Sequence, residues 1–244
     1  MPLPPSVARG PGSRHSTLPQ LRGVRLMADF TIYLGNKNYS SWSLRPWLVL
    51  KQTGVAFDEI VIPLYEATSK ATIMKYSPSG TVPALRHGDL VVWDSLAICE
   101  YLAESFPTFQ LWPRDHDARA VARSVCAELH SGFQALRAHL PMNVRSSFPN
   151  RGVTPEVQAE INRIMSIWRD CRKRFGEGKG NFLFGRFSIA DATYAPIVTR
   201  FRTYRIVLER EAEAYCEAIM GVPAMQEWIS AARHEPMVID KYEF

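Results

Sequence analysis

The sequence predicts an α/β domain followed by an all-helical domain, and three observations support this prediction. Short apolar strand-like segments alternate with helix-like segments from residue 30 to about residue 106. Beyond a linker at residues 107–116 there is no further convincing strand, and apolar residues instead recur every three or four positions. The chain has 244 residues, 46% of them hydrophobic, which is enough to form two modest cores.

The first domain, residues 27–106, is predicted from alternating strand and helix patterns. Strands are expected at residues 30–34 and 57–62, and helices at residues 44–53 and near 66–75. The segments RHGDL and VVW then form two short strands around a Gly-Asp turn, which is typical of an antiparallel hairpin. The segment DSLAICEYLAESF follows as a helix. The order β-α-β-α-β-β-α is that of a thioredoxin-like domain.

The second domain, residues 117–244, is predicted to be an all-α helical bundle. Apolar residues at helical spacing over residues 121–140 and 157–175 predict two amphipathic helices. Further helices are expected near residues 190–204, 209–220 and 223–232.

Two of these helices have recognisable starts. Thr154 precedes Pro155 and offers an N-cap oxygen before a proline at the first helical position. Ser188 and Asp191 have the spacing of a capping box, in which each side chain bonds the other residue's backbone N–H.

Most of the net positive charge lies in residues 1–26. These residues contain four arginines and no acid, so removing four charges from the total of +5 leaves +1 for the rest. They are rich in Pro, Gly, Ser and Arg, which predicts a disordered leader. A mis-called start with Met27 as the true first residue, or a targeting segment, is an alternative. The nearly neutral remainder predicts no nucleic-acid partner.

No membrane, disulfide or metal site is expected. The sequence has no apolar run approaching the roughly 18 residues that a membrane helix requires, so a cytoplasmic protein is predicted. No group of residues has metal-ligand spacing. The cysteines are too scattered for a disulfide framework or a CxxC motif, and they are expected to pack as reduced apolar residues: Cys99, Cys126, Cys171 and Cys216.

Three short motifs follow one another along the first domain: SSWSLR after the first strand, TVPAL before the hairpin, and DSLAICEYL at the last helix. In this order, and followed by a helical domain, they resemble the glutathione S-transferase family in its serine-type, zeta-like form. The resemblance covers nearly the whole chain from Met27 onward. It implies a homodimeric transferase that binds reduced glutathione as co-substrate and conjugates it to a small electrophile, without a metal.

The serines of SSWSLR are the candidate catalytic residues. A thiol with a pKa near 8.5 is only a few per cent thiolate at neutral pH, and a hydroxyl beside a helix N-terminus can stabilise the anion. Similarity to the zeta-like pattern favours Ser40, whereas the spacing to Arg45, which resembles that of other serine-type members of the family, favours Ser41. Ser43 fits better as a helix cap. Pro46 is expected in the first turn of this helix, where its missing N–H breaks no bond.

Five further residues are expected to bind glutathione through the same resemblance. Val82-Pro83 would form a cis-proline turn that pairs with the cysteinyl unit of the tripeptide. Ser95 would hold the γ-glutamyl carboxylate at a helix start, and Asp94 would face the ammonium group. Lys70, the only basic residue between positions 58 and 73, would meet the glycyl carboxylate.

The chain departs from the zeta-like pattern beside the candidate serines. Trp42 stands where these proteins have a cysteine, and Trp47 where they have a second arginine. These departures make glutathione conjugation the main prediction. A glutathione-dependent isomerase similar to maleylacetoacetate isomerase, or a non-catalytic glutathione-binding module, is the alternative. Tyr39, Trp42 and the segment HLPMNVR could line an electrophile pocket, and Arg145 could contact an anion.

Overall fold

A computed structural model describes Met1 and residues 29–244, so the predicted leader beyond Met1 lies outside the described residues. The first part contains a four-stranded sheet in the order β2-β1-β3-β4. Strand β1 pairs in parallel with β2 and antiparallel with β3, and β3 and β4 form the predicted antiparallel hairpin. The strands are β1 (Phe30–Leu34), β2 (Phe57–Val61), β3 (Ala84–His87) and β4 (Leu90–Trp93).

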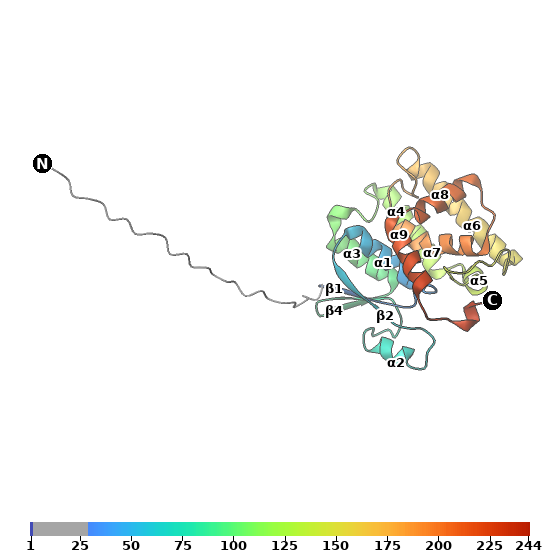
Figure 1. The fold of residues 1–244 in the computed structure, drawn as a ribbon. Helices are drawn as coiled ribbons and strands as arrows, with labels where there is room; N and C mark the ends of the chain where they lie inside the picture. Colours follow the sequence, from blue (N-terminus) through green and yellow to red (C-terminus); the bar gives the residue numbers. More distant parts are fainter. Residues whose placement is uncertain (2–28) are drawn as a thin grey trace.

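Helices cover both faces of this sheet because successive strand residues point to opposite sides. Ile32 and Leu85, which are partners across β1 and β3, belong to the large core shared with α1 (Ser41–Thr53) and α3 (Ser95–Ser105). Tyr33 and Ala84 form a smaller cluster with Ile73 of α2 (Ser69–Met74). In Figure 1, α1 and α3 accordingly lie on one side of the sheet and α2 on the other.

Helices build the rest of the described chain. Helix α7 is central, since all of its 16 residues except Arg202 are buried, and it packs against α1. The helices are α4 (His116–Ser131), α5 (Gln134–His139), α6 (Pro155–Cys171), α7 (Ile189–Tyr204), α8 (Arg210–Met220) and α9 (Pro223–His234). No helix in residues 29–244 is long and apolar enough to cross a membrane.

The single helix predicted over residues 121–140 is wrong, because the chain breaks into α4 and α5. Gly132 is the C-cap of α4, and its N–H donates to the Glu128 carbonyl. Phe133 then takes a left-handed φ of 60°, which no α-helix continues through. The apolar spacing persists across this break, and periodicity alone therefore does not reveal it.

Both predicted helix starts are present. The Thr154 hydroxyl accepts the Val157 N–H at 3.3 Å, with Pro155 following as the first helical residue. At the start of α7, the Asp191 carboxylate accepts the backbone N–H of Ser188 at 2.8 Å and the Ser188 hydroxyl at 2.9 Å. It also accepts the Leu183 N–H at 3.0 Å. Asp191 is fully buried, and this burial raises its pKa to about 6.

Candidate active site

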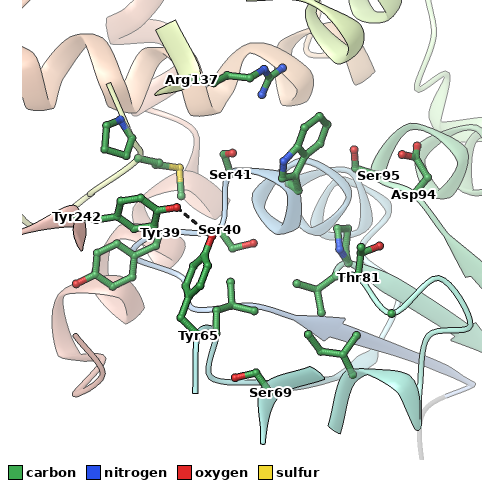
Figure 2. Close-up of a pocket in the computed structure, with 18 of the residues that line it drawn as sticks. Tyr39, Ser40, Ser41, Tyr65, Ser69, Thr81, Asp94, Ser95, Arg137 and Tyr242 are labelled. Carbon is green, nitrogen blue, oxygen red and sulfur yellow. Dashed lines mark hydrogen bonds between the residues drawn. The ribbon is translucent and has the colours of Figure 1, made fainter. Parts of the chain in front are cut away.

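A cavity of about 850 Å³ lies between the sheet and the helical part of the chain. The starts of α1 and α3, the turn before β3 and helix α2 line one side, and residues of α4, α5 and α7 line the other (Figure 2). All of the residues predicted to act on or bind glutathione line this cavity: Ser40, Ser41, Lys70, Val82, Pro83, Asp94 and Ser95. The structure therefore brings together one set of side chains that the sequence distributes over more than fifty positions.

Ser40 caps α1. Its oxygen accepts the Ser43 N–H at 3.4 Å, and its hydroxyl donates to Ser43 Oγ at 2.7 Å. Ser43 Oγ in turn accepts the Gly35 N–H at 3.0 Å. The prediction that Ser43 is the cap is wrong, because the helix begins at Ser41 rather than near residue 44. Ser40 is thus engaged in local hydrogen bonds on both its donor and its acceptor side.

Ser41 is the first residue of α1, and its hydroxyl is engaged differently. Its oxygen accepts a hydrogen bond from Arg200 Nη2 at 3.3 Å, and it donates to no acceptor among the described residues. Figure 2 shows both serine hydroxyls at the cavity, with Ser41 on the side toward Arg137. The hydroxyl hydrogen of Ser41 is therefore available at the positive end of the helix dipole.

Pro46 lies deeper in α1 than predicted. With Ser41 as the first helical residue, Pro46 falls in the second turn, and it has no N–H to donate to the carbonyl of Trp42. The expectation that it breaks no intrahelical bond is wrong for this reason. The fixed φ of proline still restrains the backbone next to the serines.

The turn before β3 contains the expected cis peptide bond between Val82 and Pro83. Lys70 lies on α2, within the helix expected near residues 66–75, and its ammonium group donates to the Gly80 carbonyl at 3.0 Å. This contact ties α2 to the turn, so Lys70 is held at the edge of the cavity.

The Asp94-Ser95 pair sits at the start of α3. Asp94 is the N-cap; its Oδ1 accepts the N–H groups of Leu96 at 2.8 Å and Ala97 at 3.3 Å. Its Oδ2 lies 3.1 Å from His130 Nε2 of α4. Ser95 is only 2% exposed, yet its Oγ has no hydrogen-bond partner among the described residues. A buried unpaired hydroxyl costs about 1–3 kcal/mol, so a ligand group that pairs with it would be favoured.

Three arginines that sequence reasoning did not assign to binding or catalysis surround the start of α1. Arg137 and Arg200 line the cavity, and Arg45 lies behind Trp42 with its guanidinium carbon 4.3 Å from the indole centre. The corresponding distance for Arg137 is 4.7 Å. Burial, followed by repulsion from Arg137, lowers the pKa values of Arg45 and Arg200 to about 9. Both remain cations at neutral pH.

The C-terminal segment closes one side of the cavity. Tyr242 lines it and lies with its hydroxyl 3.0 Å from that of Tyr65. Tyr39 also lines the cavity, as expected, and its hydroxyl donates to Glu243. Arg145 does not line the cavity; its guanidinium donates to the Tyr39 hydroxyl at 2.8 Å and to the Glu235 carbonyl at 2.6 Å. Arg145 therefore holds the C-terminal segment in place and does not contact the cavity.

Comparison with known proteins gives a consistent family assignment. Residues 39–105 match the family model of the glutathione S-transferase N-terminal domain, and residues 118–231 match that of the C-terminal domain. Glutathione S-transferase Z2 of Arabidopsis thaliana is 28% identical over 203 residues, covering 78% of this chain and 88% of the relative. Maleylacetoacetate isomerase of Rattus norvegicus is 27% identical over 181 residues, covering 72% and 80%.

Solved structures agree on the fold. A glutathione transferase homologue from Burkholderia with bound glutathione superposes with a TM-score of 0.64 at 24% identity, covering 84% of this chain and 98% of the other. A theta class glutathione S-transferase from Xanthomonas axonopodis pv. citri with glutathione bound superposes with a TM-score of 0.63 at 22% identity, covering 83% of this chain and 98% of the other. The chain belongs to the glutathione S-transferase family, and the predicted thioredoxin-like domain followed by a helical domain is confirmed.

The family assignment makes glutathione the co-substrate. Among residues 29–244, no group of three or more His, Cys, Asp or Glu side chains is placed to hold a metal ion. The four cysteines of the chain are all buried as free thiols, and none lies at the cavity. Glutathione is therefore the thiol that the family assignment brings to this cavity.

Proposed function

We propose that this chain is a serine-type glutathione transferase in which Ser41 donates a hydrogen bond to the thiolate of bound glutathione. The single observation that supports this role is the Ser41 hydroxyl at the cavity, whose hydrogen no described residue accepts. Ser40 is the less suitable donor, because its hydrogen bond goes to Ser43. A hydroxyl donor and the dipole of α1 act together on the sulfur, and each pKa unit of depression requires about 1.4 kcal/mol.

The other groups of the tripeptide have partners around the same cavity. The Ser95 hydroxyl and the start of α3 would hold the γ-glutamyl carboxylate, and Asp94 would face the ammonium group. The backbone at Val82 would pair with the cysteinyl unit. Lys70 would meet the glycyl carboxylate if its ammonium group left the Gly80 carbonyl. Together these contacts would bring the sulfur near Ser41.

The electrophile would bind against the helical side of the cavity. Met142 and Tyr242 line that side, and Trp42 and Tyr65 line the cavity from the side of the sheet. The thiolate attacks the electrophilic carbon, forms the carbon–sulfur bond and expels the leaving group with its electron pair. The rate enhancement comes from a larger thiolate fraction and from proximity of the two substrates.

The proposal also includes the assembly and location of the protein. We propose two domains, residues 27–106 and 117–244, joined by a linker at 107–116, and a cytoplasmic homodimer as the working form. The similarity to glutathione S-transferases supports the dimer. Size-exclusion chromatography with light scattering would measure its mass directly.

A thiolate titration tests the proposal. Glutathione bound to the wild-type protein should show thiolate absorbance at a lower pH than free glutathione, and an aryl halide should be conjugated. Binding without any lowered thiol pKa would support a non-catalytic glutathione-binding module instead. The similarity to maleylacetoacetate isomerase makes a cis-enoyl diketo acid the second substrate to assay. Isomerisation of this acid without conjugation of the halide would favour the isomerase.

Ser95→Ala is expected to weaken binding of S-methylglutathione about ten- to a hundredfold, because a hydroxyl bonded to a carboxylate contributes about 1.5–3 kcal/mol. The melting temperature should change little, since the Ser95 hydroxyl has no protein partner among the described residues. Isothermal titration calorimetry and thermal unfolding measure the two effects. Ser105→Ala, an exposed serine at the far end of α3, is the matched control. Unchanged affinity in Ser95→Ala would remove Ser95 from the binding site.

A further inference from the structure

Arg200 of α7 reaches across to the start of α1 and is held there by three neutral acceptors. Its Nε donates to the Leu140 carbonyl at 2.8 Å, its Nη1 to the Pro196 carbonyl at 3.1 Å, and its Nη2 to Ser41 Oγ at 3.3 Å. The side chain is buried, with an exposed fraction of 4%. A planar guanidinium with three directed bonds has little freedom to move.

The positive charge of Arg200 is not neutralised by the protein around it. In residues 29–244, no carboxylate forms an ion pair with Arg200, Arg45 or Arg137. The titratable groups that influence Arg200 are Arg137, Tyr204 and Tyr242. Burial lowers the pKa of Arg200 to about 9, which leaves it charged at neutral pH. A buried cation without a carboxylate stabilises an anion placed nearby.

The bond from Arg200 constrains the Ser41 hydroxyl. Because the oxygen accepts from a cationic donor on its Arg200 side, its own hydrogen must point elsewhere, and the cavity is the open direction. A hydroxyl that accepts from a cation is also polarised, so it becomes a stronger donor. Neither effect can be predicted from the sequence around SSWSLR, because Arg200 lies 159 residues after Ser41.

We propose that Arg200 is a positioning residue for the transferase reaction, which directs the Ser41 hydroxyl toward the glutathione sulfur and strengthens its hydrogen bond to the thiolate. The proposal rests on the proposed function of Ser41. Through Arg200, the helical part of the chain would contribute to activation of the thiol as well as to binding of the electrophile.

The test is a double-mutant cycle read as the pKa of bound glutathione. Arg200→Gln is expected to raise this pKa by about one unit relative to wild type, and to lower kcat/KM at pH 6.5 by about tenfold. In the Ser41→Ala background, the same substitution should raise the pKa by less than half as much. Arg202→Gln, at the exposed position of the same helix, should match wild type. Affinity for S-methylglutathione, which has no thiol to ionise, separates thiol activation from binding.

Two outcomes would overturn the proposal while leaving the transferase function intact. One is a wild-type pKa depression that Arg200→Gln does not change. The other is that Arg200→Gln raises the pKa of bound glutathione equally in the wild-type and Ser41→Ala backgrounds. Arg200 would then act on the thiolate only through its charge and not through Ser41. A wild-type protein without any depressed thiol pKa would instead contradict the proposed function itself.

A crystal structure of the wild-type protein with glutathione provides a second test, which does not depend on whether Arg200→Gln folds. The sulfur is expected within hydrogen-bond distance of Ser41 Oγ, with Arg200 Nη2 still donating to the same oxygen. A sulfur bound at Ser40, or an Arg200 side chain that has left Ser41, would overturn the proposal.

Discussion

Replacing Ser41 with alanine is expected to raise the pKa of bound glutathione by one to two units and to lower kcat/KM at pH 6.5 about ten- to a hundredfold. The hydroxyl would contribute a hydrogen bond to a charged sulfur, and such bonds contribute about 1.5–3 kcal/mol. The dipole of α1 would remain, so binding of the tripeptide should persist. Thiolate absorbance against pH and the pH profile of kcat/KM with an aryl halide measure the effect.

Ser40→Ala is the matched comparison for this result. Ser40 caps α1 through the Ser43 N–H, so its loss should lower the free energy of unfolding by about 1 kcal/mol. Ser40→Ala should raise the pKa of bound glutathione by less than Ser41→Ala does. If Ser40→Ala shifts the thiol pKa and Ser41→Ala does not, the assignment of the two serines is reversed.

Asp191→Ala is expected to lower the free energy of unfolding by about 3–5 kcal/mol, the largest stability effect that we predict. The substitution leaves the buried N–H groups of Leu183 and Ser188 without their acceptor, and each unpaired group costs about 1–3 kcal/mol. It also loosens the start of α7, the helix that carries Arg200. Urea unfolding followed by circular dichroism measures the loss. A change below 1 kcal/mol would contradict the role of this capping box.

Asp191 also predicts a pH dependence of stability. Its pKa is about 6 in the folded protein, above the ordinary value of 3.8, so the folded state binds the proton more tightly than the unfolded state. The stability from this group is therefore fully present below about pH 4 and is lost as the pH rises through 6. The difference between wild type and Asp191→Asn, which does not titrate, should change by up to about 3 kcal/mol over this interval. A constant difference would show that Asp191 does not titrate there.

The sequence predicts most of the fold because the signals are local. The β-α-β-α-β-β-α order follows from short strands and turn residues, and the Ser188–Asp191 spacing alone locates the start of α7. The start of α1 was predicted about three residues too late, because serines and a tryptophan before Leu44 give no helical periodicity. The capping hydrogen bonds of Ser40 define that start, and they become visible only with coordinates.

The cavity was predicted less completely than the fold. The predicted motif residues Ser40, Ser41, Val82, Pro83, Asp94 and Ser95 all line it, because their motifs follow β1, precede β3 and follow β4, which meet at the same end of the sheet. Arg137, Arg200 and Tyr242 were missed. Their helices or segments give ordinary amphipathic or loop patterns, and nothing in the sequence sets the packing angle that points them at α1. Arg200 differs from a surface arginine in that it is buried and forms no ion pair with a carboxylate of the described residues, and both features are visible only in the three-dimensional structure.

The C-terminal segment has a consequence for how the protein is made. The backbone N–H groups of Lys37 and Asn38 donate to the Glu235 carboxylate, and Tyr39 is held by Glu243, about 200 positions later. The ribosome therefore synthesises the glutathione side of the cavity first, and the residues that hold residues 37–39 in place follow about 200 positions later. Contacts of such long sequence separation form late in folding. A nascent chain from which residues 235–243 have not yet emerged would therefore lack these contacts, and the site would be finished only after this segment folds back onto residues 37–39.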